Sequence, residues 1–303
     1  MLDSPQKQVI IVLGPTASGK TRLAIELALK YDTAIISADS RQCYREMKIG
    51  VARPSEKELA AVPHYFIASH SIQEELTAAD FEKYALEKAE LIFGEKDTVV
   101  MAGGTGLYIK AFCEGLDAIP SVDPEIRRNI IQQYEKKGIE WLQDQLRLKD
   151  PAFASQGEMQ NPQRMMRALE VWEATGSSIL SFRNSQKTKR PFQVRKIGID
   201  LPREELNRRI DQRVEQMMKD GLLEEVKALL PYKNLNLLRT VGYAELFEHL
   251  EGKIGLDEAV SLIKTHTRQY AKRQMTWFRK DTSINWVRNP ELSEALAAIG
   301  EHK

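Results

Sequence analysis

A segment near the N-terminus, GPTASGKT at residues 14–21, has the residue types and the spacing of a phosphate-binding loop. Its two glycines let the backbone fold so that successive N–H groups point at phosphate oxygens, and its lysine adds a mobile positive charge. An apolar run precedes the segment and a helical pattern follows it, so the N-terminus of a helix would face the same anion. The alternative interpretation is a glycine turn with an incidental lysine. The predicted diphosphate-binding or nucleotide-binding residues are Gly14, Pro15, Thr16, Ala17, Ser18, Gly19, Lys20 and Thr21.

A carboxylate, Asp39, stands at the end of the apolar run AIISAD at residues 34–39. If this run is a strand of a parallel sheet, Asp39 lies at the carboxyl edge, where ligands bind in open α/β sheets. A second interpretation is a Mg²⁺ ligand of the kind found in phosphate-loop ATPases. A third is a helix N-cap, which aspartate often provides. The pattern alone leaves all three roles open.

Two further features have both a chemical and a structural explanation. In GGTGLY at 103–108, the glycines allow close approach to a ligand and Thr105 offers a hydroxyl, but a tight turn explains the same residues. Arg209 and Arg213 lie four residues apart and therefore share one helix face, which is commonly a solvated one.

The C-terminal region contains a basic tract with interleaved aromatic residues. Such a mixture suits an RNA backbone and unstacked bases, but a solvated helix face with a core-facing tryptophan explains it equally. The residues are Arg268, Tyr270, Lys272, Arg273, Trp277, Phe278, Arg279 and Lys280.

Short apolar runs alternate with helical patterns in the first part of the chain. Strands are predicted at 8–13, 34–39 and 98–104, which indicates an α/β fold with a parallel sheet covered by helices. After about residue 120 the pattern is mainly helical, with a candidate returning strand at 194–201 and a helix break at Gly221. The predicted domains are a phosphate-loop α/β core at 1–119, a mainly helical insertion at 120–200, and C-terminal helices at 201–303 that pack back on the core.

The bulk composition restricts the possible partners. The net charge of +1 gives no whole-molecule attraction for nucleic acid, so a polyanion must be bound by local patches. The two cysteines, Cys43 and Cys113, fit no metal-ligand spacing and suit a reducing compartment. The polar N-terminus resembles no signal peptide, and no apolar stretch is long enough to cross a bilayer. We therefore expect a cytoplasmic protein without a membrane partner.

These segments together resemble the tRNA dimethylallyltransferases, the bacterial isopentenyl-tRNA transferases of the IPP transferase family. A phosphate loop alone would leave the family open, whereas an ordered set that runs from residue 9 to about residue 287 is specific. The resembling segments are GPTASGKT (14–21), DSRQCY (39–44), KIGVARP (48–54), PHY (63–65), TAADF (77–81), GGTGLY (103–108), DPEIR (123–127), QRMMRALE (163–170), RIDQR (209–213), VGY (241–243) and RQYAKRQMTWFR (268–279).

The resemblance implies a sheet of the P-loop nucleoside-triphosphate-hydrolase type and a prenyl transfer reaction. The dimethylallyl group of dimethylallyl diphosphate would pass to N6 of the adenosine at position 37, in tRNAs that read codons beginning with U. Asp39 would be the general base, and Thr105 and Arg213 would contact the diphosphate or its bridging oxygen. The implied tRNA contacts are Asp39, Ser40, Arg41, Gln42, Thr105, Arg127, Gln163, Arg164, Met165, Met166 and Arg167.

The phosphate loop gives the expected cofactor, and the resemblance gives the expected partners. The phosphate-loop motif itself places the expected Mg²⁺ at the Thr21 hydroxyl. The partners are dimethylallyl diphosphate and the anticodon stem-loop of tRNA, and the chain is expected to be a monomer. The main alternative is a small-molecule or nucleotide kinase, which shares the phosphate loop but gives no reason for the basic aromatic tract. A third interpretation is an RNA-binding module whose phosphate loop has no catalytic role.

Overall fold

The computed structural model describes residues 6–183 and 187–301. The chain divides into two compact units, of which the first comprises Met1–Glu114 with Lys189–Lys303 and the second comprises Gly115–Thr188. The insertion boundaries expected at 120 and 200 therefore differ from the observed ones. The reason is that strand β5, Gln193–Ile199, pairs with β1 and belongs to the sheet of the first unit.

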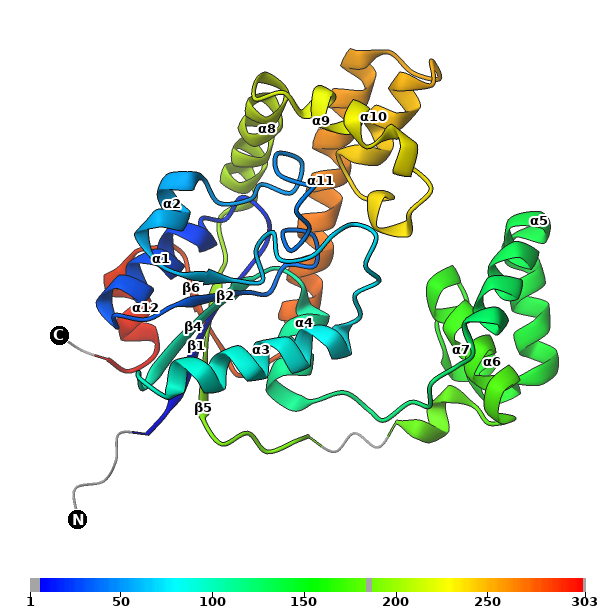
Figure 1. Cartoon of the computed structure of the whole chain (residues 1–303), viewed down its shortest axis with the longest axis horizontal. Helices are drawn as coiled ribbons and strands as arrows, with labels where there is room; N and C mark the ends of the chain where they lie inside the picture. The colour runs from blue at the N-terminus through cyan, green and yellow to red at the C-terminus, as the bar shows by residue number, and fades with distance from the viewer. Residues whose placement is uncertain (1–5, 184–186, 302–303) are drawn as a thin grey trace. The chain divides into compact units, whose positions relative to one another are not determined.

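The first unit is built on one parallel sheet of six strands in the order β3-β2-β4-β1-β5-β6 (Figure 1). This arrangement confirms the predicted α/β class with a parallel sheet of the P-loop type. The strands are β1 (Gln8–Leu13), β2 (Ile35–Ser37), β3 (His64–Tyr65), β4 (Thr98–Gly103), β5 (Gln193–Ile199) and β6 (Ile284–Val287).

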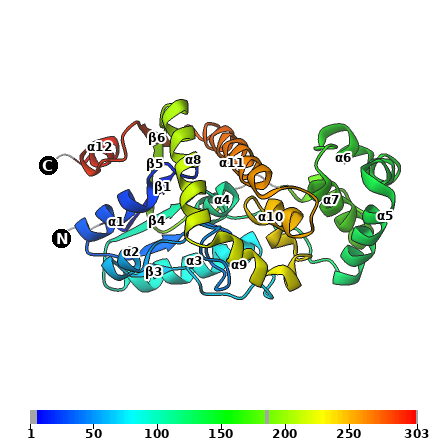
Figure 2. The same ribbon diagram turned by 90° about the horizontal axis from the view of Figure 1, so that it is seen from above.

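Both faces of the sheet are covered, which is why its central strands are apolar without interruption. In β1, Val9, Ile11 and Leu13 face one hydrophobic cluster, and Ile10 and Val12 face another. Helices α1 (Lys20–Lys30) and α12 (Leu292–Ala298) pack in the second cluster, on one face of the sheet. Helices α3 (Ala78–Phe93) and α4 (Gly106–Glu114) pack in the first, on the other face (Figures 1 and 2).

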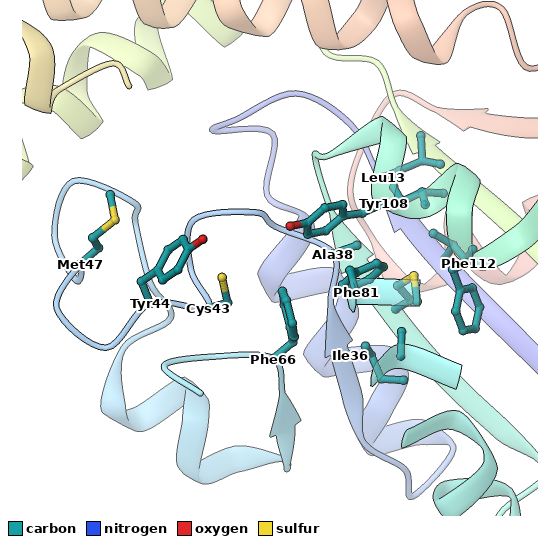
Figure 3. Packing of buried hydrophobic residues seen from close by; sticks show 14 of the residues in the cluster. Leu13, Ile36, Ala38, Cys43, Tyr44, Met47, Phe66, Phe81, Tyr108 and Phe112 are labelled. Carbon is teal, nitrogen blue, oxygen red and sulfur yellow. The ribbon is translucent and has the colours of Figure 1, made fainter. Parts of the chain in front are cut away.

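Aromatic packing in the first cluster fixes the position of α4 (Figure 3). The rings of Phe81 and Tyr108 are stacked with centroids 4.3 Å apart, and Phe66 meets Phe81 edge-on at 5.1 Å. Tyr108 lies in the first turn of α4, directly after the GGTG segment. The stacked pair therefore determines where the turn that bears Thr105 lies.

The C-terminal part of the chain adds helices to the first unit. Gly221, with a φ of 98°, separates α8 from α9 as the sequence predicts. Helix α11 packs against α4, α8 and α10, and so extends across the edge of the sheet. The helices are α2 (Glu56–Ala61), α8 (Arg203–Lys219), α9 (Leu222–Ala228), α10 (Tyr243–Leu250) and α11 (Leu256–Phe278), with 3-10 turns η2 (Leu230–Tyr232) and η3 (Asn236–Leu238).

The second unit is helical and has its own core. It contains α5 (Pro124–Lys149), α6 (Pro151–Gln156), α7 (Pro162–Thr175) and the 3-10 turn η1 (Ile179–Phe182). The side chains of Asp123 and Asn161 cap the N-termini of α5 and α7. Its core is formed by buried side chains from α5, α6 and α7, among them Leu142, Leu146, Phe153, Met165 and Leu169.

The sequence pattern did not predict the short strands β3 and β6 or the short helices α2, α10 and α12. A strand of two or four residues is too short to show the alternation that identifies strands, and it forms only because neighbouring strands offer unpaired backbone groups. Over the described ranges 6–183 and 187–301, the helices lack the combination of length and apolar character that crossing a membrane would require.

Candidate active site

The phosphate loop lies between β1 and α1, as the sequence predicts. Gly19, the residue before the helix, has a φ of 94°, in the left-handed region that glycine adopts without steric cost. Lys20 donates a hydrogen bond from Nζ to the Pro15 carbonyl at 2.6 Å, so its side chain folds back over its own loop. The Ser18 hydroxyl is fully buried and has no hydrogen-bond partner among the described residues.

Asp39 follows β2 at the carboxyl edge of the sheet. Its Oδ1 accepts hydrogen bonds from the backbone N–H groups of Arg41 at 2.9 Å and Gln42 at 3.3 Å. The carboxylate thus caps the turn that follows β2, which is related to the N-cap interpretation although no helix begins there. Asp39 also lines the cavity described below, so the capping role does not remove it from the site.

The turn that contains Thr105 is joined to the turn that follows Asp39. The Thr105 hydroxyl oxygen accepts from the Ser40 backbone N–H at 3.1 Å, and the Thr105 N–H donates to the Ala38 carbonyl at 3.2 Å. Arg41 donates to the Ser40 carbonyl at 3.0 Å. The two turns come from adjacent strands, β2 and β4, and these hydrogen bonds make them one rigid edge.

Helix α8 contributes an arginine to the phosphate loop. Arg213 NH1 donates to the Thr16 hydroxyl at 3.4 Å, and burial lowers the pKa of the Arg213 guanidinium from its usual value. Arg209, one turn earlier, is held by Glu205 at 2.7 Å. The two arginines on one helix face therefore differ in role, because only Arg213 bonds to the loop.

Gln274 on α11 is a site residue that the sequence did not single out. Its Oε1 accepts from the Thr16 backbone N–H at 2.9 Å, and its Nε2 donates to the Gly104 carbonyl at 2.9 Å. A Cβ at Gly104 would lie 2.2 Å from Gln274 Nε2, so a larger residue there would displace the Gln274 amide from this position. In the sequence, the signal that could have identified Gln274 is a polar residue on the helix face shared with Ala271 and Met275. In the structure this face is buried, and Gln274 is only 7% exposed.

These groups surround one cavity of about 760 Å³ in the first unit. Asp39, Gln42, Arg213 and Gln274 line it, as do residues 16–21 of the phosphate loop and Gly103 and Gly104 of the turn after β4. Gly14, Pro15 and Thr105 are not among the described residues that line the cavity. Lys20 and Asp39, which follow the different strands β1 and β2, therefore both line the same cavity.

The charges around the cavity influence one another. The pKa of Lys20 is lowered to about 7, first by burial and then by the positive charge of Arg213, while the carboxylate of Asp39 acts in the opposite direction. Lys20, Arg213 and Asp39 thus influence one another across a partly buried space. An anion bound at the loop would relieve the repulsion between Lys20 and Arg213.

The expected tRNA contacts of the insertion lie in the second unit. Gln163 and Arg164 are exposed at the start of α7, and Arg164 pairs with Glu158. Met165 and Met166 have side chains buried in the core of this unit, and their contact with RNA stays a prediction. Their side chains pack between α5 and α7. The predicted range 163–167 therefore combines exposed and buried residues of one helix.

Two arginines of the second unit share one buried carboxylate. Arg127 NH1 lies 3.4 Å and Arg167 NH1 3.3 Å from Glu170, whose side chain is 2% exposed. The arginine side chains themselves are 40% and 37% exposed. The pair is thus oriented by an internal charge and is accessible at the surface of this unit.

The expected Mg²⁺ position can be compared with the residues that line the cavity. Among residues 6–183 and 187–301, His, Cys, Asp and Glu form no cluster of three that could hold a metal by themselves. Thr21 and Asp39 do line one cavity with the phosphate loop. A hydroxyl and one carboxylate suit Mg²⁺, which usually binds through few protein oxygens and the oxygens of a phosphate ligand.

The chain is similar to known proteins over nearly its whole length. The family model described as IPP transferase matches residues 42–281. A tRNA dimethylallyltransferase of Christiangramia forsetii is 49% identical over 97% of this chain and 98% of the relative, and one of Cytophaga hutchinsonii is 43% identical over 97% and 96%.

Solved structures agree with these relatives. A full-length tRNA isopentenylpyrophosphate transferase from Bacillus halodurans has a TM-score of 0.69 at 32% identity, covering 93% of this chain and 90% of that one. A eukaryotic dimethylallyltransferase acting on tRNA has a TM-score of 0.76 at 26% identity, covering 97% of this chain and 77% of the other.

Proposed function

The chain belongs to the IPP transferase family, and from this premise we propose that it transfers the dimethylallyl group of dimethylallyl diphosphate to a tRNA adenosine. The acceptor is N6 of the adenosine at position 37 in tRNAs that read codons beginning with U, and the products are N6-isopentenyladenosine and diphosphate. The observation that carries the proposal is the single cavity lined by Lys20, Arg213 and Asp39. An anion-binding loop and a carboxylate within one space are what this transfer requires.

The leaving group is stabilised by the phosphate loop. As the allylic C–O bond breaks, negative charge develops on the diphosphate, and groups fixed in advance around that charge lower the barrier. The N-terminus of α1, Lys20 and Arg213 are such groups, and Gln274 holds the loop against the turn after β4. Mg²⁺ held at the Thr21 hydroxyl would supply additional positive charge to the diphosphate.

The nucleophile is prepared at the adjacent strand end. The adenine amine is weakly nucleophilic because its lone pair is delocalised into the ring, so it must lose a proton as the new C–N bond forms. Asp39 accepts that proton in the proposal, a role that typically accelerates a reaction by about 10²–10⁴-fold. Its Oδ1 is held by two backbone N–H groups, which orients the carboxylate towards the cavity before the substrate arrives.

The tRNA reaches this site with its adenosine extruded from the anticodon loop. Extrusion of a base costs a few kcal/mol, which contacts on the backbone must offset. Arg127 and Arg167 in the second unit are exposed and oriented for phosphate oxygens, which supports their assignment as tRNA contacts. The proposal places the anticodon stem-loop on these residues and the adenine next to Asp39 and Thr105.

The kinase alternative is not favoured, because the family match extends over residues 42–281, far beyond the phosphate loop. The deciding experiment incubates the purified chain with dimethylallyl diphosphate and unmodified tRNA, followed by mass analysis of the digested nucleosides. We expect one adenosine to gain one isopentenyl group, with diphosphate release that depends on tRNA. Production of ADP from ATP without nucleoside modification would refute the transferase.

A further inference from the structure

The carboxylate of Glu225, which does not line the cavity, holds a backbone segment that does. Glu225 on α9 accepts three hydrogen bonds from consecutive backbone N–H groups of a segment 175 residues earlier. Oε2 accepts from Lys48 at 2.9 Å and from Ile49 at 2.7 Å, and Oε1 accepts from Gly50 at 3.0 Å. Three successive backbone N–H groups that point at one anion form an anion-binding nest, and here the Glu225 carboxylate is the anion.

Tyr243 completes this contact from α10. Its hydroxyl donates to Glu225 Oε1 at 2.6 Å, and its ring is fully buried. A Cβ at Gly50 would lie 2.5 Å from the ring, so the backbone can approach the tyrosine only because residue 50 is glycine. Burial and the nearby carboxylate of Glu225 both raise the pKa of the Tyr243 hydroxyl, so it remains a donor.

The segment held in this way, residues 48–54, is a wall of the cavity. Residues 48, 49 and 51–54 line the cavity, and Ile49 and Val51 supply apolar surface there together with Met217 of α8. Other bonds shape the segment internally: Arg53 donates to the carbonyls of Tyr44, at 2.7 Å, and of Arg45, at 2.9 Å. Glu225 joins the shaped segment to the C-terminal helices.

We propose that Glu225, assisted by Tyr243, is a positioning residue that fixes residues 48–54 as the cavity wall and thereby sets the size of prenyl chain the enzyme accepts. Neither residue is among the described residues that line the cavity, so each acts through the backbone of the wall. The inference rests on the proposed function, because a wall with Ile49 and Val51 matters for an apolar donor chain. It assigns a role to two segments, KIGVARP and VGY, whose residues the phosphate loop does not use.

The test compares Glu225→Gln with Glu224→Gln. The second variant removes an equal charge from the neighbouring residue, which is exposed and pairs with Lys227, and it should behave as wild type. In Glu225→Gln, the side-chain NH₂ group replaces one carboxylate oxygen and faces backbone N–H groups that are also donors. We expect residues 48–54 to be held less firmly as a result. Hydrogen exchange of the peptide covering residues 44–54 should accelerate about tenfold or more in this variant alone.

Steady-state kinetics and diphosphate binding distinguish a positioning role of Glu225 from a general loss of folded enzyme. In Glu225→Gln the KM for dimethylallyl diphosphate should rise by about 10- to 100-fold, as small displacements of a reacting group can cause. The ratio of kcat/KM for geranyl diphosphate to that for dimethylallyl diphosphate should rise. The Kd for inorganic diphosphate should stay unchanged, because the phosphate loop contacts neither Glu225 nor Tyr243. A Glu225→Gln enzyme with wild-type donor KM and wild-type donor ratio would overturn the inference.

A second variant keeps the inference testable if Glu225→Gln does not fold. Tyr243→Phe removes one of the four hydrogen bonds and keeps the ring under Gly50, so the same shifts should appear in smaller size. If a folded Tyr243→Phe variant shows unchanged hydrogen exchange of residues 44–54 and an unchanged KM for dimethylallyl diphosphate, Tyr243 does not assist Glu225. Absence of prenyl transfer by the wild-type chain would refute the proposed function, whereas normal transfer with unchanged donor KM in Glu225→Gln refutes the positioning role alone.

Discussion

At the scale of single residues, the site depends on side chains that each have a structural and a chemical role. Asp39 caps a turn through Oδ1 and also lines the cavity. Lys20 bonds to its own loop and also contributes charge to the cavity. A substitution at either position must therefore preserve the structural contact if it is to report on the chemistry.

Asp39→Asn is the substitution that separates these roles at the proposed base. The amide oxygen still accepts from the N–H groups of Arg41 and Gln42, but the group can no longer take a proton. We expect kcat to fall by about 10²–10⁴-fold while the Kd for tRNA stays within about tenfold of wild type. Single-turnover kinetics and filter binding measure the two quantities. Retained turnover with lost tRNA binding would contradict the assignment.

The lowered pKa of Lys20 predicts proton uptake on binding of diphosphate. The free site holds Lys20 with a pKa of about 7, so above that pH its amine is mostly neutral. A bound anion favours the charged form and raises this pKa, so binding at pH 8 takes up a proton and affinity decreases as pH rises through about 7.

Calorimetry in two buffers of different ionisation enthalpy measures this uptake. Lys20→Met is the control, since titration of the diphosphate itself is common to both proteins. We expect the wild-type chain to take up more protons at pH 8 than the variant does. Equal uptake would show that the Lys20 amine is already charged in the free site.

At the scale of elements, α11 determines the shape of the phosphate loop. Gln274 connects the Thr16 N–H to the Gly104 carbonyl and so ties the end of β1 to the end of β4. A polar side chain that is 7% exposed and makes two such bonds is costly to replace, because both backbone groups would be left unpaired.

Gln274→Glu tests this connection. The carboxylate still accepts from Thr16 but cannot donate to Gly104, and it places negative charge beside the diphosphate. We expect diphosphate binding to weaken by about tenfold, equivalent to about 1.4 kcal/mol. Gln269→Glu, on the exposed face of the same helix, adds the same charge away from the loop. If both variants bind equally, the contact of Gln274 has no influence on the anion site.

At the scale of the whole molecule, the two units divide the work. The sheet, the cavity and every residue proposed to act on the diphosphate lie in the first unit, and Arg127 and Arg167 lie in the second. The near-neutral chain offers no general attraction for RNA, so the proposal assigns part of the electrostatic attraction for tRNA to these local arginines.

Replacement of residues 115–188 by a flexible glycine-serine linker tests this division. The sheet order is complete without the second unit, so the shortened chain should fold and should bind inorganic diphosphate as the full chain does. Its tRNA affinity should be lost. In the full chain, Arg127→Ala should reduce the slope of log affinity against log salt by about 1. Full tRNA affinity in the shortened chain would contradict the proposed role of the second unit.

The sequence by itself determined the parts of the molecule that are local. The phosphate loop is one turn of backbone between a strand and a helix, so its glycines, its lysine and its flanking patterns suffice to identify it. The alternation of strands and helices likewise predicted the parallel sheet, and Gly221 marked the break between α8 and α9. The segments of the IPP transferase resemblance identified the family because their order extends over most of the chain.

Only the tertiary structure decided which distant residues meet. Spacing placed Arg209 and Arg213 on one helix face, and the packing of α8 chose Arg213 for the phosphate loop. Gln274 and Glu225 carry no pattern of their own, because their partners lie 258 and 175 residues away in sequence. The burial of the Met165 and Met166 side chains was not predicted, because burial depends on the neighbouring helix. Contacts between distant segments form through the packing of whole elements, and local residue patterns do not contain that information.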